Sequence, residues 1–251
     1  MLTMSAPGMG AEEPKTEEQK TKVYLLQSFE LRHGTQLARI HDYLSKFSLP
    51  ALNKVHSGPK LVLEALVAPH IPQVVTLIGF ESFEQMWELK RTLSQDQELQ
   101  KAFEAWQEGS EPPFERQSNI LLEATRYSPD IAPLENPPAS PRIFELRVYH
   151  SPTWQQLLAL HERFAGPEIK IFERVGVHPL LYSSTVIGPN MPNLTYLTPF
   201  ENLAARDKAW AAFGADPEWI KVRKESVEKH GQIVNEIQIS LFRATPYSPV
   251  Q

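Results

Sequence analysis

Hydrophobic and polar positions along this chain follow the same order twice. In each half, a stretch typical of a β-strand precedes a helical stripe, two strands joined by a proline-bracketed turn, another helix and a last strand. Corresponding positions lie 120 residues apart: Pro69 corresponds to Pro189, and Asp96 corresponds to Asp216. The chain is therefore predicted to hold two copies of one β-α-β-β-α-β unit, the ferredoxin-like order.

This repeat divides the chain into four segments. Residues 22–129 are predicted to form the first unit and residues 142–251 the second, with a proline-rich linker at 130–141. Residues 1–21 show no apolar period and predict a disordered tail. Helices cover one face of each antiparallel sheet, so we expect an α+β fold in which the two bare faces pack together with the helices outside.

The special residues of each unit predict where its elements begin and end. Ser82 and Asn202 are expected to cap the helix after the turn, and Asp216-Pro217 to restart it. A helix from Trp154 to about Gly176 is expected to be broken at Gly166-Pro167. Strands are expected at residues 23–30, 61–68, 74–80 and 120–125, and again at 143–149, 180–187, 194–200 and 233–242.

Composition narrows the classes of function. A hydrophobic content of 41%, with 22% charged residues, is ordinary for a globular protein. The net charge of −5 without a basic stripe argues against nucleic acid as a partner, and no apolar run is long enough for a membrane span. As written, the sequence predicts a cytoplasmic protein. The alternative is export, because Leu2–Ala11 resembles the end of a signal peptide whose front is missing.

Residues of the second unit resemble the NIPSNAP family. They are Val186-Ile-Gly-Pro-x-x-Pro-Asn-Leu-Thr-Tyr-Leu-x-x-Phe-Glu, Arg206-x-x-x-Trp-x-x-Phe-x-x-Asp-Pro-x-Trp219 and the opening Phe144-Glu-Leu-Arg-x-Tyr149. The first unit matches more loosely. This resemblance implies two tandem NIPSNAP-like domains with the dimeric α/β-barrel form of the ferredoxin-like fold. It implies no established reaction.

Polar residues alternate with apolar ones along the strand that opens the second unit. Glu145, Arg147 and Tyr149 share one face, which we expect to point into the lumen between the sheets. An arginine in that place could bind a carboxylate or carbonyl group, or it could pair with Glu145 for a purely structural reason. Further polar groups expected in the same lumen are Tyr182, Tyr196, Glu236 and Gln238.

Three other residues are secondary candidates for a site. His41 and His161 lie 120 positions apart, but helical spacing places His161 on the apolar stripe, which favours packed, hydrogen-bonded histidines. Arg206 precedes Trp210 by one helical turn, which favours an arginine whose apolar stem is buried and whose cation caps a backbone carbonyl or stacks on the Trp210 ring. No spacing suits a metal, and no nucleotide, zinc-protease or serine-hydrolase motif is present. We therefore expect neither a metal nor a cofactor.

The sequence leaves three classes of function open. The first is a small-molecule binding or interaction protein that uses the lumen and forms a homodimer or a larger assembly. The second is a cofactor-independent monooxygenase or isomerase of a small aromatic or carbonyl substrate, in which Arg147 holds an oxyanion and Tyr149 or Glu236 moves a proton. The third is an adaptor that binds other proteins. A lumen filled by side chains would argue against both ligand hypotheses.

Overall fold

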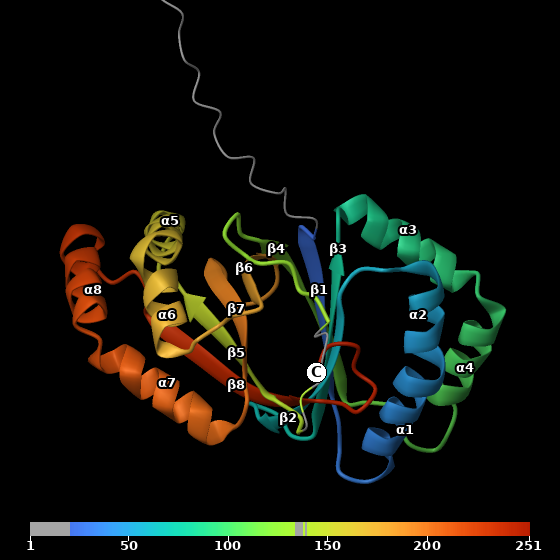
Figure 1. Ribbon diagram of the computed structural model, residues 1–251. Helices are drawn as coiled ribbons and strands as arrows, with labels where there is room; N and C mark the ends of the chain where they lie inside the picture. Colours follow the sequence, from blue (N-terminus) through green and yellow to red (C-terminus); the bar gives the residue numbers. More distant parts are fainter. Residues whose placement is uncertain (1–20, 134–137, 139) are drawn as a thin grey trace, which may run out of the picture.

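The computed structural model describes residues 21–133, 138 and 140–251. Residues 1–20 of the tail predicted at 1–21, and part of the linker predicted at 130–141, therefore lie outside the described residues. The two units have the predicted α+β order, and together their strands form one closed, eight-stranded antiparallel barrel (Figure 1). The fold predicted from the repeat is confirmed.

The strands occupy equivalent places in the two units. Within each unit, the first strand lies between the third and the fourth, and the second pairs with the third. The strands are β1 Val23–Glu30, β2 Lys60–Val67, β3 Gln73–Phe80, β4 Arg116–Ala124, β5 Ile143–His150, β6 Leu181–Ile187, β7 Asn193–Phe200 and β8 Glu236–Ala244.

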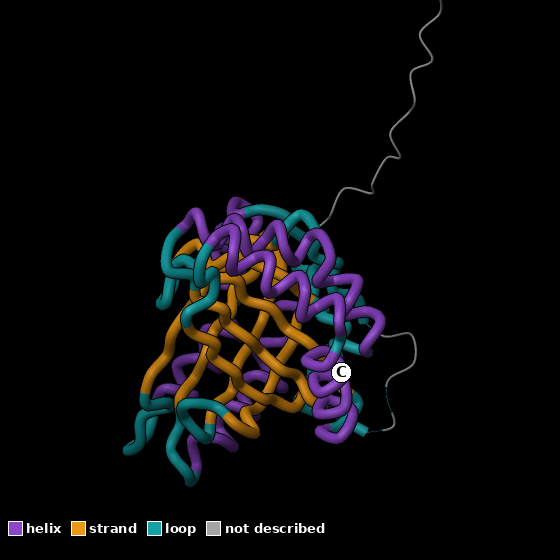
Figure 2. The backbone as a smooth tube through the Cα atoms, turned by 90° about the vertical axis from the view of Figure 1, so that its left-hand side faces the viewer, coloured by secondary structure: helices purple, strands orange, loops and turns teal. Residues whose placement is uncertain are grey.

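The two units join at their edges. β2 pairs with β8, and β4 pairs with β6, which closes the barrel within one chain. The two sheets thus face each other across a common interior and also share backbone hydrogen bonds, so each unit supplies the strand that the other needs at its edge. The strands cross at an angle inside a shell of helices (Figure 2).

All helices lie outside the barrel, one set over each unit (Figures 1 and 2). Apolar stripes on the helices face the outer side of the sheet, where they form separate cores for the two units. The helical segments are α1 Thr35–Tyr43, η1 Leu44–Ser48, α2 Leu49–Val55, α3 Phe83–Ser94, α4 Gln97–Gln107, α5 Trp154–Arg163, η2 Phe164–Glu168, α6 Ile169–Val175, α7 Leu203–Ala215 and α8 Pro217–His230.

The predicted caps begin the helices where expected. The Ser82 hydroxyl accepts the backbone N–H of Gln85, and the Asn202 side chain accepts that of Ala205. Asp216 accepts the backbone N–H groups of both Glu218 and Trp219, directly before α8. The break predicted at Gly166-Pro167 is confirmed. The chain continues through the π-helical turn η2, with Gly166 outside helical geometry, into α6.

The segment between the units takes part in the barrel core. Ile131 is buried together with Phe144, Leu181 and Val250 in the cluster that fills the barrel interior. The Asp130 carboxylate accepts the backbone N–H of Thr21, which ties the start of the segment to the start of the first unit. The described part of the predicted linker is therefore anchored on the barrel.

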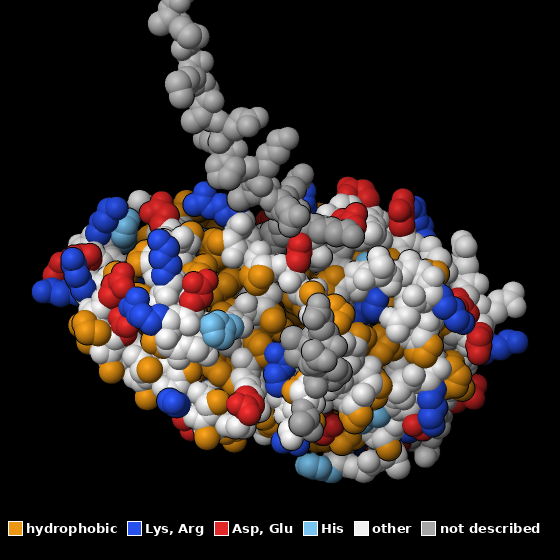
Figure 3. Space-filling view, viewed as in Figure 1, with side chains coloured by type: hydrophobic (Ala, Val, Ile, Leu, Met, Phe, Trp, Pro, Cys, Tyr) orange, Lys and Arg blue, Asp and Glu red, His pale blue; other side chains and the backbone are white. Residues whose placement is uncertain are grey.

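The visible surface carries mixed charge. On the face seen in Figure 3, basic and acidic side chains alternate over both sets of helices, without a large area of one sign. None of the helices in the described part of the chain combines the length and the apolarity that a membrane crossing requires.

Candidate functional site

The barrel interior is filled by side chains. Tyr24, Leu122 and Phe144 are fully buried there and contact a cluster of aliphatic residues from both units. The space left at one end, beside Leu146 and Gln238, amounts to about 60 Å³. That volume holds one or two water molecules and no metabolite. The expectation of a ligand site in the lumen is therefore wrong.

The face assignment of β5 is reversed with respect to the prediction. Phe144 and Leu146 point into the barrel, whereas Glu145, Arg147 and Tyr149 lie between the sheet and the helices of the second unit. The physical reason is that both faces of this strand are covered, one by the barrel interior and the other by the helices. The alternation of side chains therefore separates two faces of the strand but does not show which one points into the barrel. The barrel interior takes the apolar set.

Glu145 is the centre of a buried network of charges. Its carboxylate accepts hydrogen bonds from Arg147, from Arg206 at 2.5 Å and from the indole N–H of Trp210 at 3.1 Å. The Arg147 guanidinium lies 3.6 Å from the centre of the Trp210 ring. Glu145 is thus fully engaged with protein groups. Arg206 binds this carboxylate, and the cation that stacks on the Trp210 ring is Arg147.

Two tyrosines continue this network toward α5. Arg147 donates to the Tyr149 hydroxyl at 3.1 Å, and the Tyr196 hydroxyl donates to that of Tyr149 at 2.8 Å. Burial raises the pKa of both phenols, so they stay protonated near neutral pH. Tyr182 packs in the same cluster on the helix side of the sheet. These three tyrosines are together, but outside the lumen in which they were expected.

The two candidates on β8 do face the interior side of the sheet, at its open end. The Gln238 amide donates to the Glu236 carboxylate at 2.7 Å, and both side chains are exposed. They are separated from the tyrosine cluster by the sheet itself, because Tyr149 lies on the other face. Glu236 therefore cannot share a site with Arg147 and Tyr149.

The paired histidines are held at the junctions between the units. His161 bonds the Tyr127 hydroxyl at 2.7 Å and the Ser184 hydroxyl at 2.9 Å, and burial lowers its pKa to about 4. His41 likewise contacts Tyr247 at 2.7 Å and Glu64 at 3.1 Å. Each histidine thus contacts a tyrosine that follows the last strand of the other unit. Within the described residues, no cluster of three or more metal-ligating side chains occurs.

A cavity lies beside the tyrosine network, between the outer face of β5 and β8 and the segments α5, η2 and α8. Its volume is about 300 Å³, at the lower end of the range for small-molecule sites. Ile237 and Val227 are exposed at its mouth, whereas Tyr149 and Glu168 are buried at its base. Its lining consists of Tyr149, Arg163, Glu168, Phe213, Trp219, Arg223, Val227, Gln232, Ile233, Val234 and Ile237.

Two charged residues of this cavity escaped prediction from the sequence. The Arg163 Nε donates to Glu168 at 2.7 Å, and the Glu168 side chain is 1% exposed. Burial raises the pKa of Glu168 to about 6, an effect that Arg163 partly offsets. A signal was present: the two residues flank the Gly166-Pro167 break, and the first unit has Tyr43 and Ser48 in their places.

The family comparison covers the half of the chain that contains this cavity. Residues 144–249 match the NIPSNAP family model. These residues form a NIPSNAP domain. The match begins at the second residue of β5 and ends beyond β8, so every residue of the cavity lining belongs to the matched range. No curated protein matches the chain.

Solved structures share the architecture of the whole chain. An anthrone oxidase-like protein is 13% identical, with a TM-score of 0.54, 91% of this chain covered and 92% of its own. A protein from Lactobacillus acidophilus provisionally named a monooxygenase is 12% identical, with a TM-score of 0.52 and coverages of 89% and 94%. At such identities these likenesses show the fold alone. A NIPSNAP-like domain protein from Burkholderia xenovorans is 26% identical over 43% of this chain and 89% of its own, with a TM-score of 0.37.

In the first unit, aromatic rings fill the space that corresponds to this cavity. Trp106 stacks on Tyr43 with the ring centres 4.6 Å apart, and it also contacts Phe29 and Phe114. The NIPSNAP domain has Ser226 at the position that corresponds to Trp106. Its hydroxyl oxygen is buried without a hydrogen-bond partner. The indole ring of Trp106 thus has no counterpart in the NIPSNAP domain.

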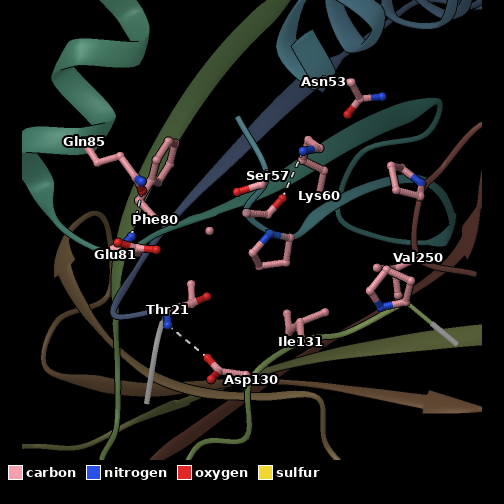
Figure 4. A pocket seen from close by; sticks show the side chains of 15 residues that line it. Thr21, Asn53, Ser57, Lys60, Phe80, Glu81, Gln85, Asp130, Ile131 and Val250 are labelled. Atoms are coloured by element: carbon pink, nitrogen blue, oxygen red, sulfur yellow. Dashed lines mark hydrogen bonds between the residues drawn. The ribbon is translucent and has the colours of Figure 1, made fainter. Parts of the chain in front are cut away.

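A second cavity, of about 350 Å³, lies outside the NIPSNAP domain core, against β2 and β3 of the first unit (Figure 4). Lys60 and Asp130 stand on opposite sides of it. The Lys60 ammonium donates to the carbonyls of His56 at 2.7 Å and Gly58 at 3.0 Å, at the end of α2. Its charge thus serves as a helix cap. The cavity of the NIPSNAP domain offers the better-placed charges for a ligand.

Proposed function

We propose that the NIPSNAP domain binds a small, largely apolar molecule in the cavity between its sheet and α8. The observation that carries this proposal is the difference between the two units: the same space is packed with rings in one and open in the other. Apolar side chains of Phe213, Trp219 and Ile233 line the cavity, and a few polar groups stand at its base. This composition is typical of small-molecule sites.

Indole is a suitable probe, because the first unit places the indole of Trp106 in the equivalent space. We expect indole to bind with a dissociation constant on the order of 0.1–1 mM, as for a ligand of this size. Val227→Trp should fill the mouth of the cavity and weaken binding by at least about tenfold. A ligand-observed NMR titration measures both constants.

The repeat supplies a matched control for this experiment. Gln107→Trp makes the same kind of change at the equivalent, exposed position of α4, where no cavity exists. It should leave indole binding unchanged. Equal binding by wild type and Val227→Trp, or no binding by wild type, would rule out the site.

Glu168 supports a second candidate function, a cofactor-independent monooxygenase or isomerase. A carboxylate with a pKa of about 6 inside an apolar cavity is suited to remove a proton from a carbon next to a carbonyl group. Glu168→Gln should then abolish turnover while the fold is retained. Oxygen uptake and deuterium exchange with small aryl ketones are the measurements, and full activity in the variant would exclude this mechanism.

Self-association is part of the proposed function. The first half of β8, from Glu236 to Ser240, pairs with β5 alone, since β2 meets β8 only from Leu241 onward. Ile237 and Ile239 are exposed along this stretch. A homodimer or larger assembly would cover them. Native mass spectrometry gives the number of subunits, and a monomer at all concentrations would contradict this part.

A further inference from the structure

Arg163 is a largely buried cation with only part of its guanidinium group in contact with other protein groups. Its Nε donates to Glu168, and the guanidinium carbon lies 4.9 Å from the centre of the Trp219 ring. No hydrogen bond to another of the described residues involves its two Nη groups. Because a guanidinium carries five N–H donors in a planar fork, four donors are left for a group inside the cavity.

Glu168 depends on Arg163 for its negative charge. The carboxylate is completely buried, and its one hydrogen bond to a side chain of the described residues comes from Arg163. The charge of Glu168 in turn acts on four tyrosines, whose pKa values are raised mainly by burial, so they remain neutral. They come from β5, β6, β7 and the segment after β4: Tyr149, Tyr182, Tyr196 and Tyr127.

We propose that the cavity binds a small aromatic carboxylate, whose carboxylate group takes the Nη side of Arg163 while Glu168 takes up one proton from solvent. This inference rests on the proposed function and names its class of ligand. Arg223 adds a second cation at the mouth of the cavity, so the lining carries two cations against one carboxylate. The excess favours an anion over a cation or a neutral amide.

The charges in the cavity explain why Glu168 takes up a proton when the ligand binds. With the ligand bound, two carboxylates share one buried guanidinium, and like charges at this distance in a medium of low polarity disfavour double ionisation. Glu168 is the group that yields, since burial has already raised its pKa to about 6. One proton enters from the buffer for each ligand bound, and no covalent bond of the ligand changes.

The test compares indole-3-acetate with indole-3-acetamide, which have the same shape and differ in charge. At pH 6, the acetate should bind at least about tenfold more tightly than the amide. Its dissociation constant should rise by up to about tenfold per pH unit above 6, because Glu168 must then be protonated. Amide binding should not change with pH. Calorimetry in phosphate and Tris buffers at pH 7.5 should report uptake of close to one proton.

Three variants separate the roles of the two residues. Glu168→Gln should keep the preference for the acetate and lose its pH dependence. The double variant Arg163→Gln, Glu168→Gln removes both charges together, so no buried charge is left unpaired; it should lose the preference and still bind indole. Arg174→Gln, on the exposed surface of α6, is the control and should behave as wild type.

The outcomes distinguish this inference from the function on which it rests. Binding of neither indole nor its derivatives would end both. Equal affinity for acetate and amide, with indole bound, would overturn the inference alone. Preference for the acetate without proton uptake, or an unchanged pH dependence in Glu168→Gln, would show that Glu168 has no part in binding.

Discussion

Replacing Glu145 with leucine is expected to lower the free energy of unfolding by about 3–5 kcal/mol. Glu145 is completely buried and is the shared carboxylate of Arg147 and Arg206. Its loss leaves Arg147 buried without a counter-charge, and the cost of removing a guanidinium from water is then no longer offset. Urea denaturation followed by circular dichroism measures the change.

The first unit shows how the same place can be built without charges. Leu25, Gln27 and Met86 stand where the NIPSNAP domain has Glu145, Arg147 and Arg206. The triple variant Glu145→Leu, Arg147→Gln, Arg206→Met transfers this set, and it should recover at least half of the stability that the single change removes. Buried ion networks replaced by well-packed neutral residues are often neutral in stability.

A surface pair provides the control for this prediction. Glu218 accepts a hydrogen bond from Arg174 at 3.0 Å, and its side chain is 53% exposed. Glu218→Leu makes the same chemical change and should cost less than about 1 kcal/mol, because water solvates the arginine that is left. If Glu145→Leu costs no more than Glu218→Leu, the buried network contributes nothing to stability.

The repeat explains why the architecture could be predicted from the sequence. Alternating strands, prolines and helix caps recur at the same spacing in both units, so each unit supports the assignment made in the other. Asp96 and Asp216, for example, cap the start of α4 and of α8. The break at Gly166-Pro167 could also be predicted, because glycine and proline both disfavour a continuous helix. Phe164 and Phe172, on either side of the break, pack in the same core.

The site could be predicted only in part, because face and depth are set by tertiary contacts. Alternation along β5 correctly placed its polar side chains on one common face. Whether that face points into the barrel or toward the helices depends on the tertiary packing around the strand. Arg163 and Glu168 have no motif, and each alone resembles an ordinary helical charge. They meet in a cavity only because the fold brings α5, η2 and α8 together over β5, in a space that the rings around Trp106 fill in the first unit.

Phe144→Ala is expected to destabilise the protein by about 3–5 kcal/mol, because the ring is fully buried inside a barrel whose strands cannot close around the gap. Phe144 lies directly opposite Phe242 on β8, and both belong to the interior cluster. Phe172 is equally buried, but it lies under the helices on the other side of the sheet. Phe242 and Phe172 therefore lie on opposite sides of the sheet, and coupling of Phe144 to one or the other shows which way the Phe144 ring points.

Double-mutant cycles test the orientation of β5 through these partners. The Phe144→Ala, Phe242→Ala pair should deviate from additivity by about 0.5–3 kcal/mol, since the second truncation enlarges a cavity that already exists. The Phe144→Ala, Phe172→Ala pair should add within about 0.5 kcal/mol, because the sheet separates the two rings. The reverse pattern would place Phe144 under the helices and Arg147 in the barrel. In a closed barrel, these two cycles therefore report which face of β5 points into the barrel and which points toward the helices.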